Sequence, residues 1–293
     1  MKELRLVATT VLYNPQNNVI DNIKSYIEYV EKIIIVDNSI ENNIELIEAI
    51  KNIFKEKVIY IHNKDNLGIA KALNIGCDIA IDLNYNFILT MDQDSCFENF
   101  EHYLKCIENL DNTENVAIYA AHTDLIKEIK KEVNQEYKEE NIVITSGNII
   151  NLKYFNKIGR FDDKLFIDSV DFDFCLKAKI NGFRILLFKT VYVKHSLGEG
   201  YWRTNFFTRK KKYSIEHNPQ RHYYIARNSM YLSKKYGKLF PKEAGFLKTI
   251  NKLYINGIIR ILVYEDNKIN KIKARFIGLY HYMINKFGKY DFK

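Results

Sequence analysis

Short apolar runs alternate with amphipathic stretches along the first hundred residues. The runs are rich in Val, Ile and Leu, which is typical of strands buried on both faces, and the stretches between them carry apolar residues at helical spacing. This alternation predicts βαβ units, and hence an α/β fold with a mostly parallel sheet flanked by helices, whose ligands bind at the carboxyl ends of the strands. The predicted strands are Leu4 to Leu12, Ile33 to Val36, Val58 to Ile61 and Phe87 to Met91.

The pattern changes twice farther along the chain. Strand-like runs at Val116 to Ala121 and Ile142 to Ile144 flank a charged stretch, and from Phe206 onward the chain is expected to be mostly helical. We therefore predict one domain over residues 1–202, followed by a basic, mostly helical C-terminal region over residues 203–293 that packs on it.

The net charge of +8 is unevenly distributed. The region from Arg203 to Lys293 holds 21 Lys or Arg against 5 Asp or Glu, a net charge of +16, which leaves −8 for the preceding residues. A basic, aromatic-rich region favours anionic partners, so an anionic membrane surface and a nucleic acid are both candidates on this observation. Apolar contacts with a membrane would come from Trp202, Phe206, Phe207, Tyr254, Ile258, Ile259 and Leu262.

The cysteines and the N-terminal segment indicate the compartment. The cysteines form no CxxC pair, which favours reduced thiols. The first residues lack a signal-peptide cleavage site, and no run approaches the roughly 20 apolar residues of a membrane span. We expect a cytoplasmic protein, and the basic region adds the expectation of peripheral attachment to the inner face of the cell membrane. The cysteines are Cys77, Cys96, Cys106 and Cys175.

Two acids close the fourth predicted strand in the segment LTMDQDS, where Asp92 and Asp94 flank Gln93. Magnesium and manganese ions prefer oxygen ligands, and they usually bind through one or two carboxylates together with substrate phosphates. The position at a strand end favours a site for Mg²⁺ or Mn²⁺. The structural alternative is a solvated turn that caps the next helix.

Polar residues also follow the second and third predicted strands. Asp37 closes the second strand in IIIVDNS, where its carboxylate either accepts the ring N–H of a uracil or thymine base or caps a helix. Asn66, Gly68 and Asn74 lie after the third strand in NKDNLGIAKALN. Gly68 permits close backbone approach, and the helix that begins there offers free N–H groups to an anion.

Taken in order along the chain, these segments resemble the rhamnosyltransferases of glycosyltransferase family 2. The resemblance runs from Tyr13 to about Tyr236. It implies a GT-A fold, a divalent metal, and sugar transfer with inversion from a nucleoside diphosphate sugar. The matching blocks are LYNP, VDNS, NLGIAKALN, TMDQDS, SGNIINLKYF, GRFDDKLFIDSVDFDFCLKA, GFRI, VKHSLG and HNPQRHYYIARN.

The resemblance also implies a binding site for the donor. Tyr13 and Asp37 would contact the base, while the acids of TMDQDS would bind the metal and the diphosphate. A lone histidine is more often a structural residue than a ligand, but the context VKHSLG assigns His195 a place near the metal. The nucleotide-sugar site would comprise Tyr13, Asp37, Asn66, Gly68, Lys71, Asp92, Gln93 and Asp94, and the metal ligands would be Asp92, Asp94 and His195.

Inversion by a single displacement needs a carboxylate that takes the proton of the acceptor hydroxyl as the new bond forms. The metal stabilises the departing diphosphate separately. By the resemblance the base is Asp171, which opens a helical pattern from Val170 to Ala178. Asp168 and Asp173 are rival bases, and helix capping is the structural alternative for Asp171.

The match to the family has departures. Leu12 stands where many members have a polar residue, and Leu73 stands where a basic residue often precedes the matched asparagine. Lys71 is positioned to supply that charge from the same helix. Val170 replaces a frequent Glu, although the Val-Asp version is the one that the rhamnosyltransferases show. These differences weaken the assignment of the donor more than that of the reaction.

The expected function is transfer of L-rhamnose from dTDP-L-rhamnose onto a saccharide acceptor, lipid-linked or free, in bacterial surface polysaccharide synthesis. A hexosyltransferase that uses a UDP-sugar is the alternative, because residues of this kind accept uracil as well as thymine. A nucleotidyltransferase would need a Gly-rich basic loop after the first strand, and Tyr13-Asn14-Pro15-Gln16 is not one. A pure nucleic-acid-binding module would not need the site residues, so no nucleic acid partner is expected.

Overall fold

The computed structural model describes residues 5–123, 136–195, 200–204, 211–215 and 217–292. Contacts between residues divide the chain into two compact units. The first unit comprises Met1–Asp162 and Asp171–Ser196, and the second comprises Asp163–Val170 and Leu197–Lys293. Each unit has its own cluster of buried side chains.

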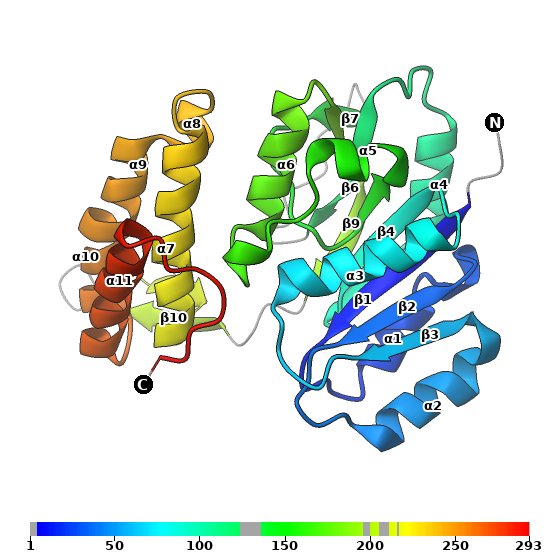
Figure 1. Cartoon of the computed structure of the whole chain (residues 1–293), viewed down its shortest axis with the longest axis horizontal. Coiled ribbons are helices and arrows are strands. Elements are labelled where there is room, and N and C mark those ends of the chain that lie inside the picture. Colours follow the sequence, from blue (N-terminus) through cyan, green and yellow to red (C-terminus); the bar gives the residue numbers. More distant parts are fainter. Residues whose placement is uncertain (1–4, 124–135, 196–199, 205–210, 216, 293) are drawn as a thin grey trace. The chain divides into compact units, whose positions relative to one another are not determined.

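Within the described residues, nine strands of the first unit form one sheet (Figure 1). Strands β3, β2, β1 and β4 are parallel neighbours in that order, which confirms the parallel half that the sequence predicts. Beyond β4 the order continues through β8, β6, β9 and β5, with β7 beside β9, and most of these pairs are antiparallel. The strands are β1 (Leu6–Leu12), β2 (Ile33–Asp37), β3 (Val58–His62), β4 (Phe87–Asp92), β5 (Ser95–Phe97), β6 (Val116–Thr123), β7 (Tyr137–Glu139), β8 (Asn148–Asn151) and β9 (Arg184–His195).

Helices flank this sheet, and asparagine side chains begin several of them (Figure 1). Asn43 caps α2 by accepting a hydrogen bond from the Leu46 N–H, and Asn99 caps α4 in the same way through the His102 N–H. The helices are α1 (Val19–Lys24), α2 (Ile44–Phe54), α3 (Ile69–Asp82), α4 (Phe100–Glu108), α5 (Leu152–Ile158) and α6 (Val170–Ile180), with short 3₁₀ turns at Ile27–Tyr29, Lys55–Lys57 and Asp163–Leu165.

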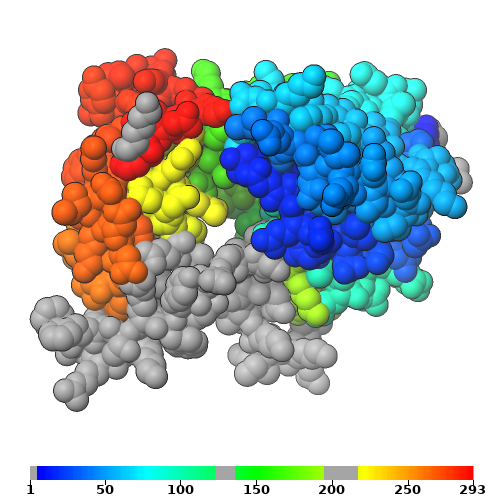
Figure 2. All heavy atoms as spheres, turned by 90° about the horizontal axis from the view of Figure 1, so that it is seen from below, coloured from blue at the N-terminus to red at the C-terminus, as the bar shows by residue number. Residues whose placement is uncertain are grey.

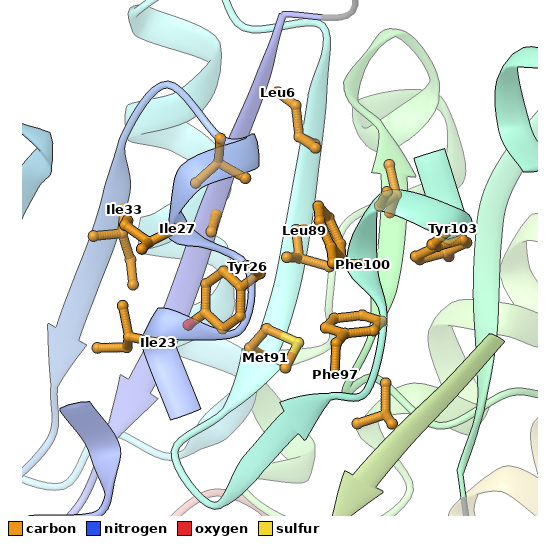
Figure 3. Close-up of a cluster of buried hydrophobic side chains, with 14 of the residues drawn as sticks. Leu6, Ile23, Tyr26, Ile27, Ile33, Leu89, Met91, Phe97, Phe100 and Tyr103 are labelled. Atoms are coloured by element: carbon orange, nitrogen blue, oxygen red, sulfur yellow. The ribbon is translucent and has the colours of Figure 1, made fainter. Parts of the chain in front are cut away.

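The central strand β1 is buried on both faces. One face packs against α3 at Gly76, where an added Cβ would lie 2.4 Å from the Thr9 hydroxyl oxygen, so only glycine allows this approach. The other face joins an aromatic and aliphatic cluster in which Phe97 and Phe100 meet edge to face at 4.7 Å (Figure 3). Each large apolar side chain buried there contributes about 1.5–3 kcal/mol. This core fixes the carboxyl ends of β1, β2 and β4 relative to one another.

The predicted strand at Ile142–Ile144 is wrong. That run is irregular, although Val143 is buried and its carbonyl accepts a hydrogen bond from the Cys175 thiol. The strand that pairs with β4 is β8, which begins at Asn148, after the left-handed turn at Gly147. The three apolar residues of Ile142–Ile144 indicate that the run is buried, but burial alone does not distinguish a strand from a coil that packs on the core.

The second unit is mostly helical from Pro219 onward, but it opens with an antiparallel pair of strands that the sequence pattern did not predict. Phe206, where helix was expected to begin, lies outside the described residues. The strands are short and rich in basic residues, so they lack the apolar run that usually reveals a strand. The elements are β10 (Gly200–Thr204), β11 (Lys211–Ile215), α7 (Pro219–Tyr236), α8 (Pro241–Ala244), α9 (Phe246–Ile250), a π-helical turn (Asn251–Ile255), α10 (Asn256–Tyr264) and α11 (Lys268–Met283).

Helices α7 and α11 pack along each other (Figure 1). The unit also buries a network of polar and charged side chains. The carboxylate of Glu265 lies 3.1 Å from His222 Nε2 and 3.2 Å from Lys271 Nζ. Arg275 Nε donates to His222 Nδ1 at 3.2 Å, so Nε2 of that ring bears the hydrogen that faces Glu265. All four side chains are buried. Desolvation raises the pKa of Glu265, but His222 and Lys271 outweigh it and hold that pKa at about 2.

Candidate active site

The carboxyl ends of the parallel strands bring the predicted donor-site residues to one edge of the sheet. In the strand register, Asp37 at the end of β2 lies beside Leu12 of β1, and Asp92 at the end of β4 lies beside Val11. Tyr13 follows β1 directly, between these two neighbours. The three strand exits that the sequence singled out are therefore adjacent, as expected of a ligand site in an α/β fold.

Gln93 joins the exit of β1 to the exit of β4. Its side-chain oxygen accepts a hydrogen bond from the Tyr13 N–H at 2.8 Å, and its amide nitrogen donates to the Tyr13 carbonyl at 3.2 Å. The Gln93 carbonyl also accepts from the Asn22 side chain at 2.8 Å. Gln93 thus fixes the backbone of Tyr13, whose own side chain is 46% exposed. The ring of Tyr13 is free to present a face to a ligand.

Asp37 is fully buried and has two hydrogen-bond donors from the protein. One carboxylate oxygen accepts from the Ser39 N–H at 2.8 Å, and the other accepts from the Tyr60 hydroxyl at 2.9 Å. Burial and this hydrogen bond to Asp37 raise the pKa of Tyr60 to about 12, so the hydroxyl remains a donor at neutral pH. A direct contact between Asp37 and a base therefore requires the residues that cover Asp37 to move.

Side-chain amides join the exits of β2 and β3 to the start of α3. Asn38 donates to the Gly68 carbonyl at 3.1 Å, and Asn63 donates to the Asn38 side-chain oxygen at 2.8 Å. The Asn66 side chain accepts from the Gly68 N–H at 3.0 Å, which holds Gly68 at its positive φ of 85°. Asn66 thereby shapes the turn that begins α3, and Lys71 lies exposed on the first turn of that helix.

Asp92 and Asp94 lie at the end of β4 and in the turn that follows it, and both are partly exposed. The Asp92 N–H donates to the Ser146 hydroxyl at 3.1 Å, which fixes the strand end. The next strand, β5, begins at Ser95, which pairs with His195 at the end of β9. The backbone pairing thus brings His195 within one residue of Asp94, while the His195 side chain lies outside what the structure describes.

The donor set at this edge suits a hard divalent cation. Carboxylate oxygens are the ligands that magnesium and manganese prefer, and two of them leave coordination positions for substrate phosphates. Over the described part of the chain, no three His, Cys, Asp or Glu side chains are grouped so as to hold a metal ion.

The three candidate bases differ in their surroundings. Asp173 is fully buried on α6 and forms an ion pair with Lys177 at 2.9 Å. Asp168 is mostly buried, and burial raises its pKa although Arg221 lies 3.1 Å away. Asp171, in the first turn of α6, is partly exposed and accepts a hydrogen bond from the neighbouring Phe172 N–H.

The family model for glycosyl transferase family 2 matches residues 9–177, which includes every strand exit described above. This chain belongs to that family. It is 29% identical, over 93% of both chains, to the dTDP-rhamnosyl transferase RfbF of Shigella flexneri. It is 25% identical to an uncharacterized glycosyltransferase of Methanocaldococcus jannaschii, over 73% of this chain and 77% of that one. As a family 2 member similar to RfbF, it is a glycosyltransferase that uses a nucleotide-sugar donor.

Solved structures resemble this chain in fold only, since their sequence identities to it are low. Residues 1–349 of TarS from Staphylococcus aureus superpose with a TM-score of 0.56 at 15% identity, covering 97% of this chain and 83% of that one. A structure of GalNAc-T7 with UDP, GalNAc and Mn²⁺ superposes with a TM-score of 0.54 at 15% identity, covering 67% of this chain and 44% of that one. These likenesses show the GT-A fold that the sequence predicts.

Several residues of this candidate site were not identified from the sequence. Tyr60 holds Asp37 from the neighbouring strand, and Ser39, Asn38 and Asn63 connect the strand exits. Asn74, which the sequence did indicate, bonds the backbone of Phe161 in both directions, at 3.0 and 3.1 Å, so it connects α3 to a distant segment. The Asn and Ser residues that follow the strands could have indicated these contacts. Which of them pair, however, depends on the order of the strands in the sheet.

Proposed function

We propose that the protein transfers L-rhamnose, with inversion, from dTDP-L-rhamnose to a saccharide acceptor, and that a divalent cation held by Asp92 and Asp94 binds the diphosphate. The observation that carries the proposal is the pair of partly exposed aspartates at the sheet edge, next to the exposed ring of Tyr13. The similarity to RfbF over nearly the whole chain supports the choice of donor.

Each strand exit is proposed to bind a different part of the donor. Tyr13 presents an exposed aromatic ring that suits stacking on the base, because Gln93 holds its backbone while the side chain stays accessible. The first turn of α3, with Gly68 and exposed Lys71, offers N–H groups and a positive charge to a phosphate. Asp37 is proposed to hold Tyr60 and the Ser39 turn in place next to the donor. Alternatively, its carboxylate reaches the ring N–H of the base once these residues move.

The cation would be Mg²⁺ or Mn²⁺, held by Asp92 and Asp94, with His195 as a proposed neighbour. When bound, it stabilises the charge of the departing diphosphate. The protein side chains contribute the geometry: Ser146 fixes the end of β4, and the pairing of Ser95 with His195 fixes the turn that carries Asp94. GalNAc-T7, which has this fold, binds UDP together with Mn²⁺, and this likeness supports use of a divalent cation here.

Asp171 is proposed as the catalytic base. A base must reach the acceptor hydroxyl, so its carboxylate has to be accessible and able to accept a proton. Asp173 meets neither condition, because it is buried against the ammonium of Lys177. Asp168 is mostly buried and is engaged by Arg221, whereas Asp171 keeps partial exposure at the start of α6.

The donor panel is the direct test of the substrate. The protein is incubated with Mn²⁺ and, in parallel, with dTDP-L-rhamnose, UDP-GlcNAc, UDP-glucose and UDP-galactose, and release of the nucleoside diphosphate is measured. Fast release from dTDP-L-rhamnose is the expected result. Turnover of a UDP-sugar with none of dTDP-L-rhamnose would assign the protein to the hexosyltransferase alternative, which the UDP-GlcNAc complex of the TarS neighbour makes the natural competitor.

The second unit is proposed to bind an anionic membrane surface, where a lipid-linked acceptor would lie. Its outer surface includes an apolar stripe on the π-turn and α10, formed by Ile255, Ile259 and Leu262, each at least half exposed at helical spacing. A second stripe on α11 holds Ile269, Phe276, Tyr280 and Met283. Figure 2 shows atoms of these helices, in orange and red, at the surface of the unit.

The other side chains named for this role divide into two groups. Tyr254 and Ile258 are partly buried, so they contribute less to such a surface than their neighbours. Trp202, Phe206 and Phe207 have side chains outside what the structure describes. No helix in the described part of the chain is long and apolar enough to cross a bilayer. Binding would therefore be peripheral, through the apolar stripes and the lysines that flank them.

A further inference from the structure

The segment that leads into α6 has an unusual backbone. Three of its residues that carry a Cβ, Phe166, Asp168 and Ser169, have left-handed φ values of 64°, 63° and 65°. This conformation brings the Cβ close to the backbone and costs free energy at each position. Such backbone persists only where the surrounding structure holds it in place.

Two neighbouring side chains of α7 hold the carbonyl groups of this segment. The Asn228 side-chain nitrogen donates to the carbonyls of Leu165 at 2.9 Å, Ile167 at 2.8 Å and Asp168 at 2.9 Å. Arg227 donates from one terminal nitrogen to the carbonyls of Lys164 at 3.2 Å and Leu165 at 3.1 Å. Both side chains are fully buried. Four consecutive or nearly consecutive carbonyls are thus bound by one pair of residues.

The pair is oriented as a unit. The Asn228 side-chain oxygen accepts from Arg227 Nε at 3.0 Å, so the amide cannot flip without losing its contacts with the segment. The remaining terminal nitrogen of Arg227 donates to the Gly288 carbonyl and to the Tyr223 hydroxyl, and the guanidinium lies 5.0 Å from the centre of the Tyr224 ring. Within the described residues, Arg227 meets carbonyls, a hydroxyl and aromatic rings, and no carboxylate.

Burial of a guanidinium that has no carboxylate partner costs free energy unless acceptors match its N–H donors. Here one terminal nitrogen of Arg227 bonds carbonyls of the segment, and the other bonds Gly288 and Tyr223. A third contact, from Arg221 Nε to the Asp168 carboxylate at 3.1 Å, holds the same loop from the side. Three side chains of α7, those of Arg221, Arg227 and Asn228, therefore bind this segment.

The chain passes from this segment directly to the proposed base. Contacts assign Asp163–Val170 to the second unit, and the chain re-enters the first unit at Asp171. Asp171 lies in the first turn of α6, directly after Val170, so the chain enters that turn from the segment that Arg227 and Asn228 bind.

We propose that Arg227 and Asn228 are positioning residues for the transfer reaction: by fixing the backbone from Lys164 to Asp168, they set the start of α6 and the place of the Asp171 carboxylate. The proposal rests on the proposed role of Asp171 as the base. A base displaced by about 1 Å loses on the order of 10²-fold in rate, so the effect is expected in turnover and not in donor binding.

The test compares Asn228→Ala with Tyr224→Phe, a control on the same helix. The Tyr224 hydroxyl donates to the Tyr290 carbonyl and accepts from the Tyr290 N–H, and neither contact involves the segment. Turnover of the donor that wild type uses is measured at saturation with Mn²⁺, together with the donor Kd by calorimetry and the melting temperature. Asn228→Ala is expected to lose 10- to 100-fold in kcat with Kd unchanged within twofold, whereas Tyr224→Phe keeps kcat within twofold at a lowered melting temperature.

Wild-type kcat for Asn228→Ala, or an equal fall in kcat for both variants, would overturn the positioning role. If Asn228→Ala does not fold, Arg221→Gln replaces it, since Arg221 is half exposed and its loss leaves the helix packing intact. That variant is expected to lose several-fold in kcat with donor Kd retained, and wild-type kcat would again contradict the proposal. Absence of nucleotide-sugar binding by the wild-type protein is a separate result, which would remove the proposed function itself.

Discussion

In the first unit the main buried cluster consists of aliphatic and aromatic side chains, whereas in the second unit the helices close over charged ones. The first cluster includes Tyr26, Phe97 and Phe100, and two acids of the first unit, Asp92 and Asp94, are partly exposed at the sheet edge. The second unit buries Arg227 and the network around Glu265. Charge that remains accessible is available to a ligand, and charge that is buried in a matched network is not.

This difference changes the meaning of the net charge. The C-terminal region is strongly basic, but Arg227, Lys271 and Arg275 are buried and bind carbonyls, His222 or Glu265. These buried residues therefore contribute nothing to the binding of an anionic membrane surface. The two partly exposed acids at the end of β4, Asp92 and Asp94, are more informative, because their position after a strand was interpretable without knowing what surrounds them.

The largest effect is expected from Asp171→Asn in the first unit. The amide keeps the shape of the side chain but cannot accept a proton, so turnover should fall by about 10³-fold. Donor affinity should stay within twofold, because the base contacts the acceptor. Steady-state rates combined with calorimetry check both numbers. Near-wild-type turnover would transfer the role to Asp168 or Asp173.

The second unit is expected to respond in stability. Glu265→Gln removes the carboxylate that lies 3.2 Å from Nζ of buried Lys271, and loss of one partner from a buried ion pair costs about 3 kcal/mol or more. Thermal unfolding should show a clearly lowered midpoint. The donor Kd measured below the midpoint should be unchanged, and a large loss of donor affinity would contradict the division of roles between the units.

The pH dependence of that loss sharpens the comparison. The pKa of Glu265 is about 2 in the folded protein, below its ordinary value of 4.5. A group with a lowered folded pKa stabilises the protein above the unfolded pKa, and that stabilisation is lost as pH falls toward the folded value. The midpoint difference between wild type and Glu265→Gln should therefore be constant from pH 7 to about pH 5 and shrink below it. A difference that stays constant down to pH 3 would contradict the assignment.

His217 should also make the folded protein less stable as pH falls, and it should do so at higher pH than Glu265. Burial, followed by the charge of Arg221, lowers the pKa of His217 from 6.5 to about 4. The unfolded chain therefore binds a proton between about pH 6.5 and 4 that the folded protein does not, which destabilises the fold as pH falls through that range. Replacement by Asn should flatten the wild-type stability profile between pH 6.5 and 4, measured by chemical denaturation. An unchanged slope would show that His217 does not contribute.

The smallest effect is expected at a membrane. Lys or Arg near an anionic leaflet contributes about 1 kcal/mol each, and only the exposed ones count. Flotation with anionic liposomes should show binding at low salt that weakens at high salt. Ile259→Ser combined with Leu262→Ser, on the exposed stripe of α10, should weaken it further. Absence of binding at low salt, or binding indifferent to lipid charge, would remove the membrane proposal.

The parallel half of the sheet was predictable because its strands are continuous apolar runs followed by polar exits, as Phe87–Asp92 shows. The strand β8 and the pair of β10 and β11 were not, because short strands with polar or basic residues have no distinctive period. In the site, Asp92, Asp94 and Tyr13 lie together as expected, while the burial of Asp37 under Tyr60 depends on a neighbouring strand. The boundary between residues 202 and 203, and the packing of one region on the other, stay predictions.

The central claim is that the exposed acids of the first unit bind the donor through a divalent cation. It is tested most directly by calorimetric titration of dTDP-L-rhamnose into wild type, Asp92→Ala and Asp94→Ala, with Mn²⁺ and with EDTA, after circular dichroism has shown that each variant is folded. Wild type should bind only with Mn²⁺, and each variant should lose that metal-dependent binding. Binding by either variant with the metal dependence of wild type would contradict the account.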